Sequence, residues 1–113
     1  MAAMPQRPEF SVEVRETATA IVVAPTGELD MATVPRLRAA LDSVSRDATR
    51  LVLDLRELEF IDTSGMRLIL ELNERARRDG LDLALVPGHD AVQRLFEIAG
   101  VAGELPFGDA PAD

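Results

Sequence analysis

The sequence predicts an α/β domain with a single sheet of four or five mostly parallel strands, an antiparallel first strand and about three helices. The main observation is that short apolar runs alternate along the chain with segments whose apolar residues recur at helical spacing. The expected order is β-β-α-β-α-β-α with a possible final strand. Such alternation is typical of right-handed crossovers in a parallel sheet.

The composition limits what this domain can do. The chain has 113 residues, 47% of them hydrophobic, which fits one globular domain with a modest core. The net charge of -8 repels phosphate backbones and anionic membranes, so a protein with a basic surface is a better partner than nucleic acid. Cysteine is absent, which excludes disulfides and thiolate metal sites and favours a reducing, cytoplasmic location. Neither a membrane-spanning run nor the apolar core of a signal peptide is present.

We expect one domain over residues 9–108, between a disordered tail at 1–8 and a loose tail at 109–113. Before the second tail, residues 104–107 could form a short strand, which Pro106 would restrict to the sheet edge. There is no internal repeat.

Two strands and a helix are expected in the first part of the domain. Residues 10–15 alternate apolar and polar, which predicts a half-exposed edge strand. Residues 20–24 are continuously apolar and predict a central strand, ended by Pro25-Thr26-Gly27. Asp30 or Thr33 is expected to cap the following helix, which ends near residues 46–47.

The central stretch contains a strand, a turn and a helix. Residues 51–55 predict a strand buried on both faces, followed by an acidic loop at 56–59. Phe60 and Ile61 are expected to pack under the turn at 61–65, where the helix begins, and Gly80 can provide its left-handed end. One apolar face is predicted for this helix, formed by Gly65, Leu68, Ile69, Leu72 and Ala76.

A further strand and helix complete the expected domain. Residues 81–86 predict a strand, and the turn at 87–90 supplies Asp90 as a plausible N-cap. The helix that follows is stopped by Gly100 and buries one stripe of residues, Val92, Leu95, Phe96 and Ala99.

Catalysis is not predicted. Thr63 or Ser64 could act as a nucleophile only beside a general base, and the single histidine, His89, lies in a turn after a different strand. The Gly-x-Ser-x-Gly pattern of a nucleophile elbow is also absent. We therefore expect a protein that is not an enzyme.

Metal and nucleotide sites are not predicted either. No Gly-rich phosphate loop follows any expected strand, so no cofactor is expected. Acidic residues gather between residues 54 and 62, but they lack the spacing of a calcium loop and predict a solvated acidic rim. The residues of this rim are Asp54, Glu57, Glu59 and Asp62.

The turn Asp62-Thr63-Ser64-Gly65 has two interpretations. In the first, these residues only cap a helix, because their side-chain oxygens accept from N–H groups of the first turn. In the second, exposed hydroxyls at the helix N-terminus carry a phosphate, which the dipole and free N–H groups receive. Gly65 would let another backbone approach closely.

Three segments in this order resemble motifs of the STAS domain family. They are Gly27-Glu28-Leu29-Asp30 before a helix, Phe60 to Met66 at the start of another, and Ala91 to Phe96 shortly before Gly100. The resemblance extends from residue 10 to residue 107 and is greatest to the small bacterial anti-sigma factor antagonists.

This resemblance implies a regulatory function and its partners. Members of the family bind an anti-sigma factor that is also a serine/threonine kinase of the histidine-kinase-like ATPase type, and binding releases a sigma factor. The kinase phosphorylates the hydroxyl residue after the motif's aspartate, which breaks the complex, and a PP2C-type phosphatase reverses this reaction.

Matched to this sequence, the acceptor is Thr63, with Ser64 as second choice, and Asp62 is the preceding aspartate. Glu28 and Asp30 match a loop near the partner surface, and we expect Met66 and Leu70 on the helix flank to provide apolar contacts, with core filling as the alternative. The expected partner-binding residues are Glu28, Asp30, Asp62, Gly65, Met66 and Leu70.

The chain departs from the family pattern in two ways. Threonine stands where serine is usual, which could slow phosphorylation or shift it to Ser64. No helix is expected after the last strand, which would leave an apolar face for a partner or for a second copy in a homodimer. Two alternative functions stay open: a STAS subunit of an ABC-type lipid transport complex, and a scaffold subunit of a signalling assembly.

Overall fold

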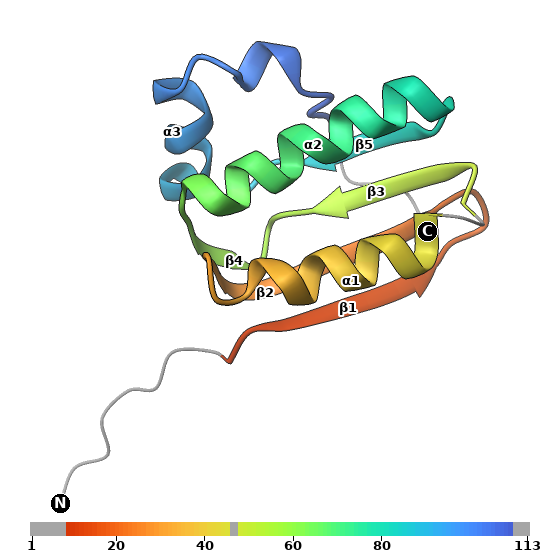
Figure 1. The fold of residues 1–113 in the computed structure, drawn as a ribbon, viewed down its shortest axis with the longest axis horizontal. Coiled ribbons are helices and arrows are strands. Elements are labelled where there is room, and N and C mark those ends of the chain that lie inside the picture. The colour runs from red at the N-terminus through yellow and green to blue at the C-terminus, as the bar shows by residue number, and fades with distance from the viewer. Residues whose placement is uncertain (1–8, 46–47, 110–113) are drawn as a thin grey trace, which may run out of the picture.

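The computed structural model describes residues 9–45 and 48–109. The expected tails at 1–8 and 110–113, and the expected helix end at residues 46–47, lie outside the described residues. Within the described part, five strands form one mixed sheet and three α-helices pack around it (Figure 1). The predicted fold class is therefore confirmed.

The sheet has the order β1-β2-β3-β5, and β4 pairs with the end of β2. β1 (Ser11–Glu16) is the antiparallel edge strand, paired with β2 (Ile21–Leu29). β3 (Arg50–Asp54) lies parallel between β2 and β5 (Asp82–Val86). β4 (Leu58–Ile61) is also parallel to β2. All strands after β1 therefore point their carboxyl ends in the same direction.

β2 is longer than the sequence predicts, because Pro25-Thr26-Gly27 does not end it. Proline lacks an N–H and usually interrupts a strand that has neighbours on both sides. Here β3 pairs with residues 21–23 and β4 with residues 27–29, so Pro25 falls in the gap between these two pairings. The strand can thus continue to Leu29.

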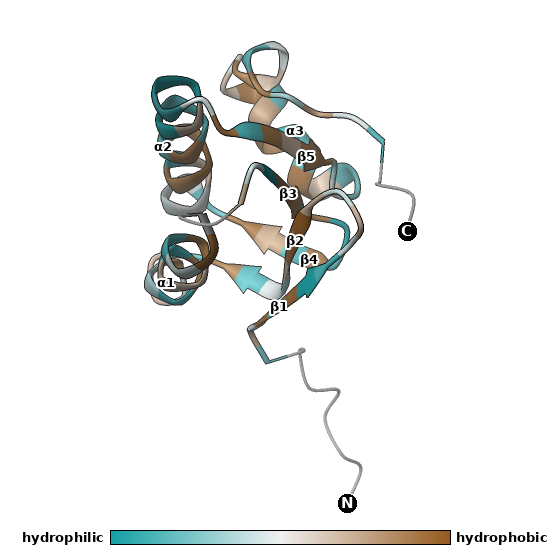
Figure 2. Ribbon diagram, turned by 90° about the vertical axis from the view of Figure 1, so that its right-hand side faces the viewer, coloured by the Kyte–Doolittle hydropathy of each residue, from teal (hydrophilic) through white to brown (hydrophobic). Residues whose placement is uncertain are grey.

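Two helices lie side by side over one face of the sheet (Figures 1 and 2). They are α1 (Val34–Ser45) and α2 (Thr63–Asp79). Figure 2 shows the hydrophilic residues of α2 on its outer side and the hydrophobic ones toward the sheet. α2 ends at Gly80 with φ 72°, the left-handed conformation that the sequence predicts.

α3 (Asp90–Ile98) lies at the end of the sheet, near the start of α2 (Figure 1). Its N-cap position is His89 rather than Asp90, and the His89 side chain makes no capping hydrogen bond. The expected final strand is mostly replaced by a 3-10 turn, Ala102–Glu104, and one bridge between Phe107 and Leu85. The sequence predicts a short edge strand here, because Pro106 lacks the N–H that a strand with two neighbours needs. The structure has only one bridge in its place.

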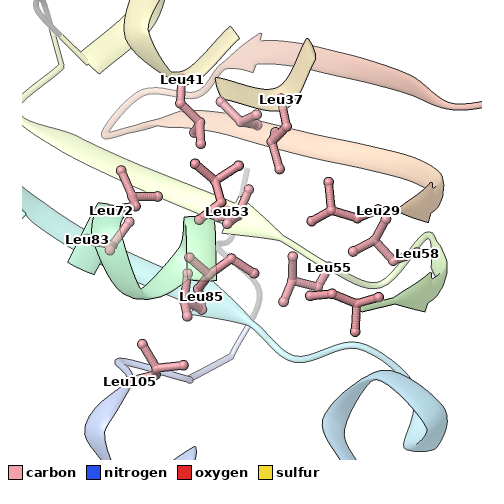
Figure 3. Close-up of a cluster of buried hydrophobic side chains, with 14 of the residues drawn as sticks. Leu29, Leu37, Leu41, Leu53, Leu55, Leu58, Leu72, Leu83, Leu85 and Leu105 are labelled. Atoms are coloured by element: carbon pink, nitrogen blue, oxygen red, sulfur yellow. The ribbon is translucent and has the colours of Figure 1, made fainter. Parts of the chain in front are cut away.

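The core between the helices and the sheet is mainly leucine (Figure 3). Leu29 and Leu58, at the ends of the sheet, are completely buried, as is Leu37 of α1. Phe96 of α3 contacts Phe107 edge to face, with ring centroids 5.4 Å apart. Close packing of this kind holds the carboxyl ends of the strands in fixed positions beneath the loops.

Candidate functional site at the carboxyl ends of β2 and β4

Two of the motifs that carry the resemblance end side by side in the fold. Glu28 pairs with Phe60 and Leu29 with Ile61 along the parallel β2–β4 ladder. The Asp62 N–H donates to the Leu29 carbonyl at 3.1 Å, which ties the two strand ends together. The β2–α1 loop and the β4–α2 turn therefore form one continuous edge of the molecule.

β4 itself differs from the sequence prediction, which places an acidic loop at residues 56–59. A four-residue strand has almost no local signal, and this one forms by pairing with β2. Ile61 is buried as expected, but Phe60 is 47% exposed rather than packed under the turn. The strand thus presents an aromatic ring beside the hydroxyl turn.

Asp62 caps α2. Its carboxylate Oδ1 accepts from the N–H of Ser64 at 2.8 Å and from the N–H of Gly65 at 3.1 Å. Its carbonyl accepts from Met66 at 3.0 Å. The expectation that free N–H groups at this helix start could receive a phosphate is therefore wrong for these donors, because Asp62 already occupies them.

The hydroxyl residues are left without a capping role. Thr63 is the first residue of α2 and is exposed, and Ser64 is half-buried. Asp62 provides the side-chain cap, and within the described part of the chain neither hydroxyl takes part in the capping bonds. Thr63 is therefore an exposed hydroxyl residue at this edge that makes no capping contact.

Gly65 is buried, and the groups closest to it belong to its own chain. A Cβ at this position would lie 2.8 Å from Leu29 Cγ and 2.8 Å from Ile61 Cγ1. The expectation that another backbone approaches here is therefore wrong, because buried side chains fill the space. The lack of a side chain at Gly65 allows α2 to pack closely on β2 and β4, and Gly65 does not form a surface contact.

The β2–α1 loop is held by Asp30 and Thr33. The Asp30 carboxylate accepts from the N–H groups of Ala32 at 2.9 Å and Thr33 at 3.1 Å. The Thr33 hydroxyl donates to the Glu28 carbonyl at 2.8 Å. Both expected cap candidates therefore shape this turn, and Glu28 and Asp30 are half-buried beside it.

Met66 and Leu70 are half-buried and pack against the leucine core. They keep partial exposure on the flank of α2. The sequence offers two interpretations of these side chains, core filling and partner contact, and both are compatible with this position.

Sequence reasoning missed one apolar feature of this edge. Met31, in the β2–α1 loop, is 77% exposed, and it joins the exposed Phe60 of the neighbouring strand as a large apolar residue at this end. A lone methionine inside a polar turn was the available signal. Such exposed side chains are typical of protein contact surfaces when they cluster.

A buried carboxylate shapes the chain between β3 and β4. Asp54 is only 5% exposed, so it is not part of the solvated rim that the sequence predicts, while Glu57 and Glu59 are exposed. The Arg56 guanidinium pairs with Asp54 through Nε at 3.0 Å and a terminal nitrogen at 2.8 Å. Burial raises the pKa of Asp54, whereas the hydrogen bonds and the charge of Arg56 lower it. The lowering is the larger effect in sum, so the pKa lies below its ordinary value.

The described residues contain no group of three or more His, Cys, Asp or Glu side chains that could hold a metal ion. No helix in the described part of the chain is long and apolar enough to cross a membrane.

The mixed sheet with two helices on one face is the fold of a known class of domain. The chain belongs to the STAS domain family, whose model matches residues 11–113. It is 28% identical over 102 residues to the anti-sigma F factor antagonist of Paenibacillus polymyxa, covering 88% of this chain and 87% of that protein. It is 32% identical over 76 residues to the anti-sigma-B factor antagonist of Staphylococcus aureus strain NCTC 8325, covering 66% and 70% respectively. Neither relative is named as an enzyme, in agreement with the sequence prediction.

Solved structures show the same fold. An anti-sigma factor antagonist from Mycobacterium paratuberculosis has a TM-score of 0.80 and 24% identity, covering 90% of this chain and 87% of that one. The Bacillus cell fate determinant SpoIIAA in its phosphorylated form has a TM-score of 0.67 and 23% identity, covering 91% and 92%. At these identities the likeness concerns the fold.

Proposed function

We propose that this protein binds an anti-sigma factor that is also a serine/threonine kinase of the histidine-kinase-like ATPase type, and thereby releases a sigma factor. Phosphorylation of Thr63 ends the complex, and a PP2C-type phosphatase restores the binding form. The protein acts in the cytoplasm. The observation that carries this proposal is the exposed Thr63 hydroxyl, which directly follows the capping aspartate and is not needed for the cap.

Thr63 is a better acceptor than Ser64 because of its exposure. A kinase must bring the hydroxyl within reach of the γ-phosphate, and Thr63 is exposed whereas Ser64 is half-buried. The family motif also places the acceptor directly after the aspartate. Ser64 is the second choice.

The docking surface lies around this hydroxyl. Its apolar part consists of Met31 and Phe60, with Met66 and Leu70 on the flank of α2. Its acidic part consists of Glu28, Asp30 and Asp62, which suits a basic partner surface. Gly65 contributes indirectly, by setting the position of α2.

A phosphate on Thr63 acts at this surface by charge and bulk. It adds about -1.5 to -2 charges next to Asp62. Two first-turn N–H groups are already bonded to Asp62, so they do not compensate this charge. A phosphate buried unpaired against a partner opposes binding by several kcal/mol, and about 1.4 kcal/mol already lowers affinity tenfold.

The test is intact-mass spectrometry after incubation with ATP and a kinase of this type. The wild-type protein should gain one phosphate, Thr63→Ala should gain none, and Ser64→Ala should behave as wild type. Thr63→Glu should lose binding to the kinase, while Thr63→Ala keeps it. The proposal is wrong if the active kinase leaves Thr63 unmodified, or if Thr63→Ala and Thr63→Glu bind equally well.

A further inference from the structure

Arg67 lies one helical turn after Thr63 on α2. We propose that the phosphate on Thr63 forms an ion pair with the Arg67 guanidinium, so that phosphorylation also neutralises a positive charge next to the docking surface. This inference rests on the proposed function, because it concerns the phosphorylated form.

The helix geometry brings these two residues together. Residues four apart on an α-helix lie about 40° apart around the axis and about 6 Å apart along it. Thr63 and Arg67 are both exposed. The anion is N-terminal to the cation, which is the more favourable orientation for such a pair.

The carboxylate of α2 that lies one turn after Arg67 already forms an ion pair with another residue. Glu71 pairs with Arg38 of α1 at 3.0 Å. Arg75, further along α2, pairs with Asp42 of α1 at 2.8 Å. No ion pair joins Arg67 to any other residue of the ranges 9–45 and 48–109.

The side chain of Arg67 also has room to turn. It lines an open hollow of about 460 Å³ between α1 and α2, together with Arg38 and Glu71. Because Arg67 is exposed, its side chain can turn toward the start of α2 without displacing core side chains.

The helix start leaves the phosphate in need of a side-chain counter-ion. Asp62 occupies the N–H groups of Ser64 and Gly65, and its carboxylate repels the dianion. Arg67 is the first cationic residue along α2. Arginine also matches phosphate oxygens with two parallel N–H donors. A partner that uses Arg67 in the complex would therefore lose this contact when Thr63 is modified.

The experiment uses the full chain with phosphothreonine inserted at position 63 during translation, so that it does not depend on any kinase. The second pKa of the phosphate is measured by ³¹P NMR titration at low salt. Arg67→Gln should raise this pKa by about 0.3 unit, the shift expected for one helical ion pair. Arg67→Lys should retain most of the wild-type value.

Arg78→Gln is the matched control. Arg78 is also an exposed arginine of α2, and its loss changes the net charge equally, but it lies about 22 Å from Thr63 at 1.5 Å per residue. It should leave the phosphate pKa unchanged. The inference is overturned if Arg67→Gln has no effect or if both substitutions raise the pKa equally. If the kinase does not phosphorylate Thr63 but Arg67→Gln raises the phosphate pKa as expected, only the proposed function is refuted.

Discussion

Gly65→Ala should lower the free energy of unfolding by about 1 to 2 kcal/mol. The added methyl group would lie 2.8 Å from Leu29 Cγ and from Ile61 Cγ1, and 2.9 Å from Leu29 Cδ2. Both side chains are buried, because Leu29 is completely inaccessible and Ile61 is 5% exposed, so neither can move into solvent. Overpacking of this kind costs about 1–3 kcal/mol, and the better helix propensity of alanine offsets up to about 1 kcal/mol of it.

Urea unfolding followed by circular dichroism measures this change. With a slope of about 2 kcal/mol/M, the midpoint should fall by roughly 0.5 to 1 M while the slope stays constant. Gly103→Ala is the matched control, because no atom lies within 4 Å of the corresponding Cβ. It should change the free energy of unfolding by less than about 0.5 kcal/mol.

A second substitution tests the cause. In a Leu29→Ala background the clash with Leu29 is gone, so Gly65→Ala should cost less there than in the wild type, and the two effects should not add. If Gly65→Ala is as stable as the wild type, the start of α2 is not packed tightly on β2 and β4, and the reasoning about Gly65 is refuted.

Three further predictions concern the cap, the buried carboxylate and the exposed apolar residues. Asp62→Ala should lower the free energy of unfolding by about 1 kcal/mol because two N–H groups lose their acceptor, and Asp62→Asn should lower it by clearly less. If urea unfolding shows the same loss of stability for both variants, Asp62 does not act as the cap. The pKa of Asp54 is lower in the folded than in the unfolded chain, so its contribution is fully present above about pH 4 and is lost as the pH falls through the folded-state pKa. The stability difference between wild type and Asp54→Asn, measured by urea titrations at several pH values, should therefore narrow on acidification, and a constant difference would rule this out. Met31→Ala and Phe60→Ala should each weaken kinase binding by about five- to tenfold in calorimetry, with Met31→Ala leaving the urea midpoint unchanged; unaltered affinity in both would remove them from the docking surface.

Much of this fold has a strong local signal in the sequence. α2 carries an apolar face at helical spacing, a capping aspartate before it and Gly80 after it, and all three features are present in the structure. The antiparallel first strand also follows from its alternation and its position in the chain order. Periodicity and end signals are local properties, so a single sequence suffices to detect them.

The features that were missed depend on contacts between distant residues. β4 exists because Leu58–Ile61 pair with β2, and Pro25 is tolerated because β3 and β4 leave a gap opposite it. Asp54 resembles a surface acid in the sequence, and only its position at the end of a buried strand, with Arg56 folding back on it, makes it internal. Met31 and Phe60 come to the same end of the sheet only after the sheet is assembled.

The cap formed by Asp62 has a consequence for the reversal of the proposed switch. Because the carboxylate already accepts from the N–H groups of Ser64 and Gly65, these two donors are not available to a phosphate. A phosphate on the exposed Thr63 stays in solvent contact, held at most by a surface ion pair of a few tenths of a kcal/mol. A hydrolase can therefore reach the phosphoester without unfolding the helix, and its rate should depend on encounter and chemistry rather than on an opening of this protein.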